Sequence, residues 1–131
     1  MTEAHVVCAR FHRAIELIGA RWSGAILRAV FTDQHRYAEI KAAIPGISDT
    51  MLAQRLRELE AAGIISRHVH AAGPVTVEYR LTEQGAELAP VMEALRSWSH
   101  RWIALDRTAA DSNQHNQPTP DLQTSTPRKS R

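Results

Sequence analysis

The sequence has very little of what cross-linked or membrane-bound proteins need. Its 131 residues include one cysteine, Cys8, so neither a disulfide within the chain nor a zinc site made of several cysteines is possible. No apolar run approaches the roughly 20 residues of a membrane-spanning helix. The first seven residues also lack the basic and apolar blocks of a signal peptide. We therefore expect a cytoplasmic protein with no membrane partner.

Motifs typical of enzymes are missing as well. The sequence has no glycine-rich phosphate-binding loop, no nucleophile elbow and no paired carboxylates in a catalytic pattern, and we expect neither catalysis nor a cofactor. The net charge of +2 is too small to indicate a nucleic-acid partner by itself. The apolar content of 44% is that of an ordinary soluble globular domain.

Composition changes sharply after residue 107. Residues 108–131 contain no aromatic side chain, three prolines and many Ser, Thr, Asn and Gln residues. Such a segment buries too little apolar surface to offset the entropy lost on ordering. We therefore predict one folded domain over residues 1–107 and a disordered polar tail over residues 108–131.

Within the domain, apolar residues recur at helical spacing in four successive segments. They predict helices over residues 11–19, 22–30, 37–44 and 48–63. Pro45 and Gly46 end the third helix and form a tight turn. Ser48 then caps the fourth helix, on which Leu52, Leu56 and Leu59 form one apolar face.

Two runs rich in β-branched residues follow, Ile64 to His70 and Val75 to Leu81. The segment Ala71-Ala72-Gly73-Pro74 joins them. They predict a β-hairpin. Thr82 then caps a long last helix that Pro90 bends near its first turns. A short helix, a tight turn, a capped amphipathic helix and a hairpin together predict a mainly α fold of the winged helix-turn-helix class.

In that fold the second helix of the pair enters the major groove, so its polar face is the predicted site for double-stranded DNA. Gln suits adenine and Arg suits guanine, while alanine allows close approach. The same side chains would form the solvated face of any amphipathic helix, but the hairpin and the short preceding helix favour DNA. The candidates on this helix are Ser48, Asp49, Thr50, Ala53, Gln54 and Arg57.

Basic side chains on and beside the hairpin are the predicted phosphate contacts. Such contacts position a protein on DNA without reading sequence. The surface of any β-ribbon can carry such basic residues. The pattern therefore leaves open whether they contact phosphates or are ordinary solvent-exposed side chains. The candidates are Arg36, Arg67, His68, His70 and Arg80.

Several stretches match a known family of bacterial regulators. They are Cys8, Ile18-Gly19-Ala20-Arg21-Trp22, Arg36-Tyr37-Ala38-Glu39-Ile40, Ile44-Pro45-Gly46-Ile47-Ser48, Met51-Leu52, Arg55-Leu56-Arg57-Glu58-Leu59-Glu60 and Val77-Glu78-Tyr79-Arg80-Leu81-Thr82. In these stretches, residues 8 to about 105 resemble the HxlR-type family of winged-helix regulators. The resemblance implies a homodimer that represses or activates neighbouring genes. Of these two effects we expect repression, exerted from an inverted-repeat operator.

The resemblance also implies that the first and last helices form the dimer interface. Trp98 and Trp102 lie one turn apart on a helix that a small monomer would struggle to cover. An ordinary core within the chain is the alternative. The interface candidates are Phe11, Ile15, Met92, Leu95, Trp98 and Trp102.

Cys8 is the candidate for signal input. In some relatives the matching thiol senses oxidants or electrophiles, and here Cys8 precedes a predicted helix with Arg10 and His12 nearby. A helix dipole and positive charge favour the thiolate. The alternative is a small buried contact, which is common for free cysteine.

Three other functions remain as alternatives, and one of them is a protein-interaction module on a winged-helix scaffold, because fold does not fix function. His5, Cys8 and His12 are spaced three and four residues apart and are legitimate ligands for a metal, so the regulator would sense a metal or a small ligand instead. Cys8 and His12 could also form the thiolate–imidazole pair of an enzyme. No further catalytic motif accompanies that pair.

Overall fold

The computed structural model describes residues 6–105. The described residues divide into two units, residues 6–97 and 98–105. The predicted tail, residues 108–131, lies outside the described residues, as does His5. Within the described range, no helix has the length and apolar character needed to cross a membrane.

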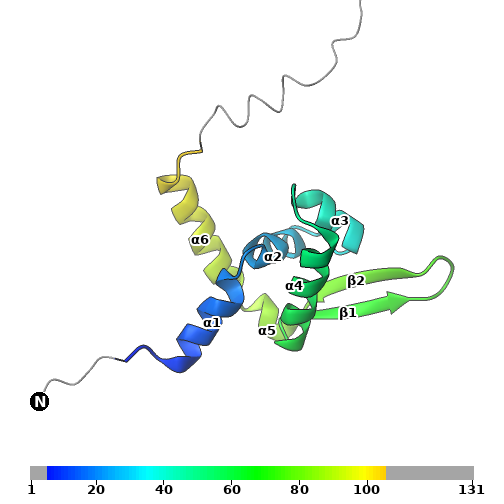
Figure 1. Ribbon diagram of the computed structural model, residues 1–131, viewed down its shortest axis with the longest axis horizontal. Helices are drawn as coiled ribbons and strands as arrows, with labels where there is room; N and C mark the ends of the chain where they lie inside the picture. The colour runs from blue at the N-terminus through cyan, green and yellow to red at the C-terminus, as the bar shows by residue number, and fades with distance from the viewer. Residues whose placement is uncertain (1–5, 106–131) are drawn as a thin grey trace, which may run out of the picture. The chain divides into compact units, whose positions relative to one another are not determined.

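The first unit contains the helix-turn-helix and the hairpin (Figure 1). Helices α1 (Ala9–Gly19), α2 (Ser23–Phe31), α3 (Tyr37–Ala43) and α4 (Asp49–Ala61) come first. Strands β1 (Ile65–His70) and β2 (Thr76–Leu81) then pair antiparallel, with Ile65 opposite Leu81 and His70 opposite Thr76. The predicted fold class, mainly α with a small hairpin in a winged helix-turn-helix, is confirmed. We call the hairpin, residues 65–81, the wing.

The core forms around the apolar faces that helical spacing predicts. Leu52, Leu56 and Leu59 of α4 are each at most 1% exposed. They belong to one cluster with side chains from α2, α3, the wing and α6. Its other members are Ile26, Leu27, Ala29, Val30, Ile40, Ile44, Ile47, Ile64, Ile65, Tyr79 and Met92. Trp22, expected in the core, is partly buried against it. This cluster fixes which face of α4 is left for a partner.

The turn between α3 and α4 follows the predicted chemistry. Gly46 has a φ of 89°, which is a left-handed conformation that glycine adopts without steric cost. Ser48 precedes α4, and its hydroxyl oxygen accepts a hydrogen bond from the Met51 N–H at 3.2 Å. A serine cap of this kind stabilises a helix by about 1 kcal/mol relative to alanine.

The long last helix expected after the wing is instead two helices, α5 (Glu83–Ala86) and α6 (Ala89–Trp102). Thr82 caps α5, as predicted, by accepting a hydrogen bond from the Gly85 N–H at 3.0 Å. Proline has no N–H to offer the carbonyl four residues earlier, and its ring clashes with that carbonyl. Pro90 therefore breaks the helix rather than bending it, and lies in the first turn of α6, where an N–H is not needed.

Candidate nucleic-acid interface

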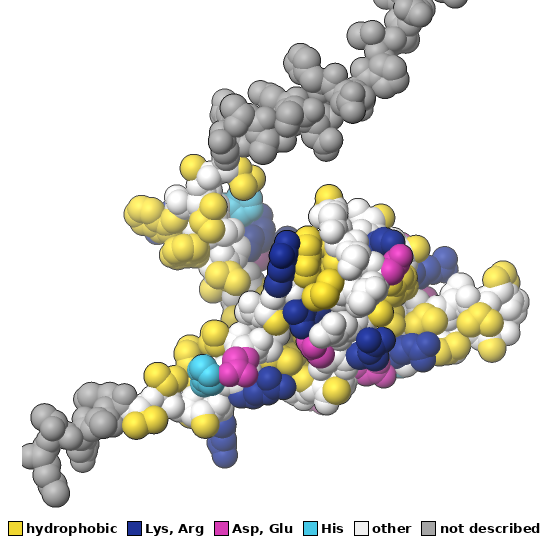
Figure 2. All heavy atoms as spheres, viewed as in Figure 1, with side chains coloured by type: hydrophobic (Ala, Val, Ile, Leu, Met, Phe, Trp, Pro, Cys, Tyr) yellow, Lys and Arg dark blue, Asp and Glu magenta, His cyan; other side chains and the backbone are white. Residues whose placement is uncertain are grey.

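The outer face of α4 is open, as the sequence predicts. Thr50, Gln54, Arg57 and Ala61 are all exposed on the side of the helix away from its three core leucines. Figure 2 shows basic side chains over α4 and the wing, with acidic ones among them. The helix is therefore positioned by its buried face and presents a mixed polar face to solvent.

The start of α4 is tied to α3 by a small polar cluster. Lys41 Nζ lies 2.8 Å from Asp49 Oδ1, and the Tyr37 hydroxyl donates to the same oxygen at 3.1 Å. These contacts, that of Lys41 first and that of Tyr37 second, lower the pKa of Asp49. Burial, and then the hydrogen bond to Asp49, raise the pKa of Tyr37. Asp49, a predicted DNA contact, thus has its charge compensated within the protein.

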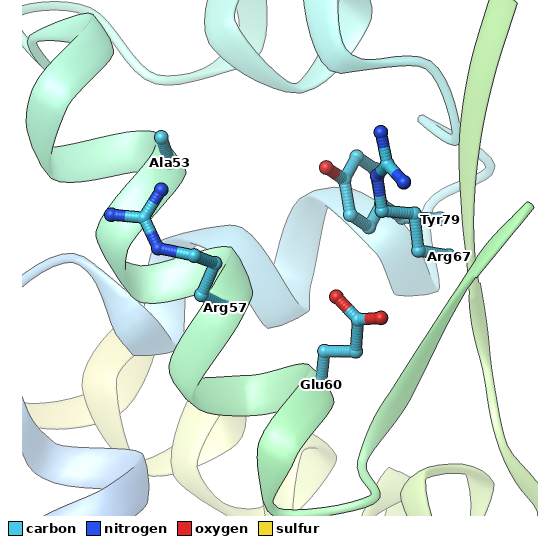
Figure 3. A pocket seen from close by; sticks show the side chains of 5 residues that line it. All are labelled: Ala53, Arg57, Glu60, Arg67 and Tyr79. Carbon is cyan, nitrogen blue, oxygen red and sulfur yellow. The ribbon is translucent and has the colours of Figure 1, made fainter. Parts of the chain in front are cut away.

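One side of the exposed face borders a cleft between α4 and the wing. Its volume is about 390 Å³, and it is lined by Ala53, Arg57 and Glu60 of α4 with Arg67 and Tyr79 of the wing. In Figure 3 the Glu60 carboxylate points into the space between the helix and the hairpin, and Arg67 lies beside Tyr79. Among the described contacts, neither Arg57 nor Arg67 has a hydrogen bond or an ion pair.

The other side of α4 is occupied by a hydrogen-bonded set of side chains. Gln54 Nε2 donates to Glu58 Oε1 at 3.2 Å, and Arg55 binds the same carboxylate. Arg55 also reaches the carbonyl oxygen of Arg21, at 2.9 Å. Gln54 and Arg57, the two predicted base readers, therefore lie on different sides of the exposed face and have different surroundings.

The wing separates its basic residues onto two faces. Side chains alternate along a strand, so Arg67 shares the α4 side with its partner Tyr79, whereas His68, His70 and Arg80 lie on the opposite face. Arg67 is the predicted phosphate contact on the α4 side.

On the opposite face of the wing the basic side chains already have partners. Arg80 Nη2 lies 2.9 Å from Glu78 Oε2, and His70 Nε2 lies 3.3 Å from it. The Arg80 hydrogen bond is the main cause that lowers the pKa of Glu78. His68 Nε2 lies 2.7 Å from Ser66 Oγ. These three predicted contacts are therefore partly neutralised or engaged.

Arg36 lies at the edge of the wing. Its backbone forms an isolated bridge with Glu78, and the neighbouring His35 carbonyl accepts the Tyr79 N–H at 2.7 Å. Its side chain is exposed. The bridge brings Arg36 next to β2, as a phosphate contact beside the wing requires.

The predicted DNA contacts did not include Lys41, Tyr37, Arg55, Glu58 or Glu60, although all of these except Lys41 lie in the stretches that resemble the family. A signal exists for Arg55 and Glu58, which are three residues apart and of opposite charge on a helix. Lys41 and Asp49 meet only because the tight turn folds α3 back on α4, and spacing alone does not reveal that contact.

Cys8 occupies the position immediately before α1 and is exposed. The backbone N–H of Phe11, and then that of Arg10, lower the pKa of its thiol. His12 does not pair with Cys8, because its Nε2 lies 2.7 Å from Glu16 Oε1. The described residues contain no group of three metal-ligating side chains, and the third candidate ligand, His5, lies outside them.

Five of the six predicted dimer-interface residues are exposed apolar side chains. Helix α1 buries none of its residues, and Phe11 is 61% exposed. Trp102 is 67% exposed. Met92 differs from the rest, being 8% exposed and part of the chain's own core. The exposed five are Phe11, Ile15, Leu95, Trp98 and Trp102.

Comparison with known proteins places the chain in a family. The model of the HxlR-like helix-turn-helix family matches residues 17–107. The chain belongs to this family. It is 37% identical over 97 residues to the uncharacterized HTH-type transcriptional regulator YvaP of Bacillus subtilis, covering 74% of this chain and 90% of that protein. It is 38% identical over 107 residues to the HTH-type transcriptional regulator YodB of the same species, covering 82% and 96%.

Solved structures agree with this assignment. Diamide-treated YodB from B. subtilis matches with a TM-score of 0.64 and 38% identity, covering 77% of this chain and all of that one. The redox regulator HypR in its oxidized form matches with a TM-score of 0.69 and 32% identity, covering 74% and 100%. The chain is thus a DNA-binding transcriptional regulator of the HxlR-type winged helix-turn-helix family.

Proposed function

We propose that this regulator binds an inverted-repeat operator as a homodimer, with α4 in the major groove and the wing along the backbone. The observation that carries the proposal is that Arg57 and Arg67 line opposite walls of one cleft and that their guanidinium groups have no hydrogen-bond or ion-pair partner within residues 6–105. DNA backbone attracts such groups, and base edges accept hydrogen bonds from them. No catalytic role is proposed, since His12 is paired with Glu16 rather than with Cys8.

The exposed residues of α4 have two different roles, contacting the bases and stabilising the start of the helix. Thr50, Ala53, Gln54 and Arg57 face the bases, and Gln54 and Arg57 make the specific hydrogen bonds. Ser48 and Asp49 keep the helix start in place, the first by capping it and the second by its bond to Lys41. The recognition helix therefore arrives at DNA with its first turn already stabilised.

Phosphate contacts come first from Arg67 and then from residues at the outer face and edge of the wing. Arg67 is unpaired and lies on the α4 side. His68, His70 and Arg80 contribute less, because each must loosen a bond to Glu78 or Ser66 to meet a phosphate. Arg36 adds a contact at the edge of the wing. Phosphate contacts of this kind add affinity without selecting sequence.

The dimer forms through α1 and α6. Phe11, Ile15, Leu95, Trp98 and Trp102 offer apolar surface that the described residues leave exposed. Exposed apolar side chains that gather on a helix face mark interaction sites, and aromatic residues are the strongest anchors at such sites. A second copy of the chain is the proposed partner, and operator half-sites related by a two-fold axis follow from it.

Cys8 makes the regulator responsive to oxidants or electrophiles. YodB and HypR, the relatives reported above, were captured in diamide-treated and oxidized forms respectively. Here the thiol is exposed and its pKa is lowered by backbone N–H groups at the start of α1. With one cysteine per chain, two Cys8 thiolates of a dimer would lose two electrons to an oxidant such as diamide and form one disulfide. Repression in the cytoplasm, relieved by this reaction, is the proposed mode of action.

Selection of duplexes from a randomised pool tests the DNA-binding proposal. We expect wild-type protein to enrich an inverted repeat whose half-sites lie about one or more helical turns apart, roughly 34–36 Å per turn. Enrichment of a single unrepeated site, or of no sequence, would contradict it. Adding diamide should reduce binding by the wild type and leave binding by Cys8→Ser unchanged.

A further inference from the structure

We propose that Glu58 is a positioning residue for Gln54: it fixes which end of the Gln54 amide faces DNA, and Arg55 holds Glu58 in place. The inference rests on the proposed function, in which Gln54 reads a base. According to this inference, Glu58 and Arg55 influence which DNA sequence is bound without touching a base themselves.

Three side chains along one side of α4 form a continuous set of hydrogen bonds. Gln54 Nε2 donates to Glu58 Oε1 at 3.2 Å. Arg55 Nη1 donates to both oxygens of the same carboxylate, at 3.1 and 2.8 Å. Spacings of three and four residues bring such side chains together on neighbouring turns of a helix. The Glu58 carboxylate thus connects the arginine to the amide.

Arg55 is itself anchored to the body of the domain. Its Nε donates to the carbonyl oxygen of Arg21 at 2.9 Å, and its side chain is only 17% exposed. Arg21 lies in the short link between α1 and α2. The next residue, Trp22, has a left-handed φ of 77° and immediately precedes α2. The Arg21 carbonyl oxygen in this link therefore accepts a hydrogen bond from the Arg55 side chain. Glu58 is therefore held by a group that is fixed relative to the α1–α2 junction.

The charge state of Glu58 decides how the Gln54 amide must point. The hydrogen bond from Arg55, then that from Gln54, and also the charge of Arg13 on α1 lower the pKa of Glu58. An ionised carboxylate accepts hydrogen bonds and cannot donate them. Gln54 must then turn its NH₂ group toward Glu58 and leave its carbonyl oxygen free.

This orientation matches the edge of adenine. A glutamine reads adenine by accepting from N6 with Oε1 and donating to N7 with Nε2, which keeps a second N–H for Glu58. An amide free to flip would also present donor and acceptor in the reverse order. By disfavouring the flipped state, Glu58 increases the preference for adenine at the base pair that Gln54 contacts.

The substitution Glu58→Gln tests this role with little change of shape. A glutamine at this position can donate as well as accept, so both orientations of the Gln54 amide become possible. The probes are the duplex selected by wild-type protein and three duplexes changed at the base pair where Gln54→Ala abolishes the preference. We expect Glu58→Gln to lower the preference for adenine there by about two- to fivefold, with other positions unchanged.

The same substitution made in Gln54→Ala protein separates positioning from stability. With no amide to orient, Glu58→Gln is expected to leave the preference at that base pair unchanged. Equal losses in both backgrounds, or no loss in the wild-type background, would overturn the inference alone. If the wild type selects no sequence, the proposed function fails and the inference fails with it.

Two further variants complete the test. Arg55→Lys keeps the charge but cannot bridge Arg21 and both carboxylate oxygens, so it should lower the adenine preference in the same direction as Glu58→Gln. An unchanged preference in Arg55→Lys would remove Arg55 from the proposal. Glu93→Gln breaks an Arg–Glu pair of the same spacing on α6 and is expected to leave the preference unchanged.

Discussion

Helices α1 and α4 both carry an apolar face, and the chain itself covers that of α4 far more fully than that of α1, of which Leu17 packs against the core. Leu52, Leu56 and Leu59 of α4 are packed in the core, whereas α1 buries none of its residues and exposes Phe11 and Ile15. Helical periodicity therefore shows that a helix has an apolar face, and says nothing of whether the same chain covers it. The exposed face of α1 is where we propose that a second copy binds, and the covered face of α4 leaves its polar side exposed to solvent.

Truncating one apolar side chain on each helix should distinguish the covered face from the exposed one. The larger loss of unfolding free energy is expected for α4. Leu56→Ala removes a side chain that is 1% exposed and should cost about 2–5 kcal/mol of unfolding free energy. Ile15→Ala removes an exposed side chain and should change the unfolding free energy of the monomer by no more than about 0.5 kcal/mol. Urea unfolding at protein concentrations below the dimer dissociation constant measures both. Equal losses would mean that α1 is covered within its own chain.

Removing apolar side chains from α6 should instead act on association. Trp102→Ala combined with Leu95→Ala removes two exposed side chains and is expected to raise the dimer dissociation constant by at least about 30-fold, since anchor residues contribute about 2 kcal/mol or more. Sedimentation over a range of concentrations measures it. Met92→Ala, which changes the core, should mainly reduce stability. A dimer that survives the double substitution intact would place the interface elsewhere.

Arg57 and Arg67 offer a comparison of the same residue type on α4 and on the wing. Arg57→Ala should cost about 1–3 kcal/mol on the operator and relax the preference at one base pair in each half-site. Arg67→Ala should weaken binding to every sequence and make the salt dependence shallower by about one unit. Arg80→Ala, which removes a cation already bound to Glu78, serves as the control and should change the salt dependence less. A uniform loss for Arg57→Ala would make it a phosphate contact.

The lowered pKa of Cys8 predicts a shift in reactivity with pH. Alkylation depends on the thiolate, so in folded protein its rate should reach half of its maximum at a lower pH than in urea-unfolded protein. Cys8→Ser, which has no thiol, gives the background rate. Coincident pH profiles would show that the backbone at the start of α1 does not favour the thiolate. Because the pKa of Cys8 is lower in the folded protein, ionisation of its thiol contributes to the free energy of unfolding at high pH. That contribution is lost as the pH falls through the folded-state pKa.

The sequence predicted the local structure well because local physics sets it. Ser48, Gly46 and the three leucines of α4 fix the start, the preceding turn and the buried face of that helix, and all three inferences are confirmed. The interruption at residues 87–88 was expected only as a bend. Pro90 breaks the helix there because it has no N–H to offer the carbonyl four residues earlier and its ring clashes with that carbonyl.

Contacts between elements were harder to predict than the elements themselves. The pairing of Lys41 with Asp49, and of Arg55 with the Arg21 carbonyl, depends on how α3, α4 and the α1–α2 link pack together. The burial of Met92 depends on which side of α6 faces the core. Neither spacing nor residue type carries that information, so the residues that contact the proposed DNA-reading side chains were not predicted, whereas those side chains themselves could be proposed from the sequence.

The stoichiometry of the DNA complex tests most directly whether α4 and the exposed face of α1 work together. Sedimentation of wild-type protein with the selected duplex should give two chains per inverted repeat. A duplex with one half-site scrambled should bind far more weakly while still holding two chains. One chain per duplex, with affinity unchanged when a half-site is scrambled, would contradict the proposed dimeric regulator.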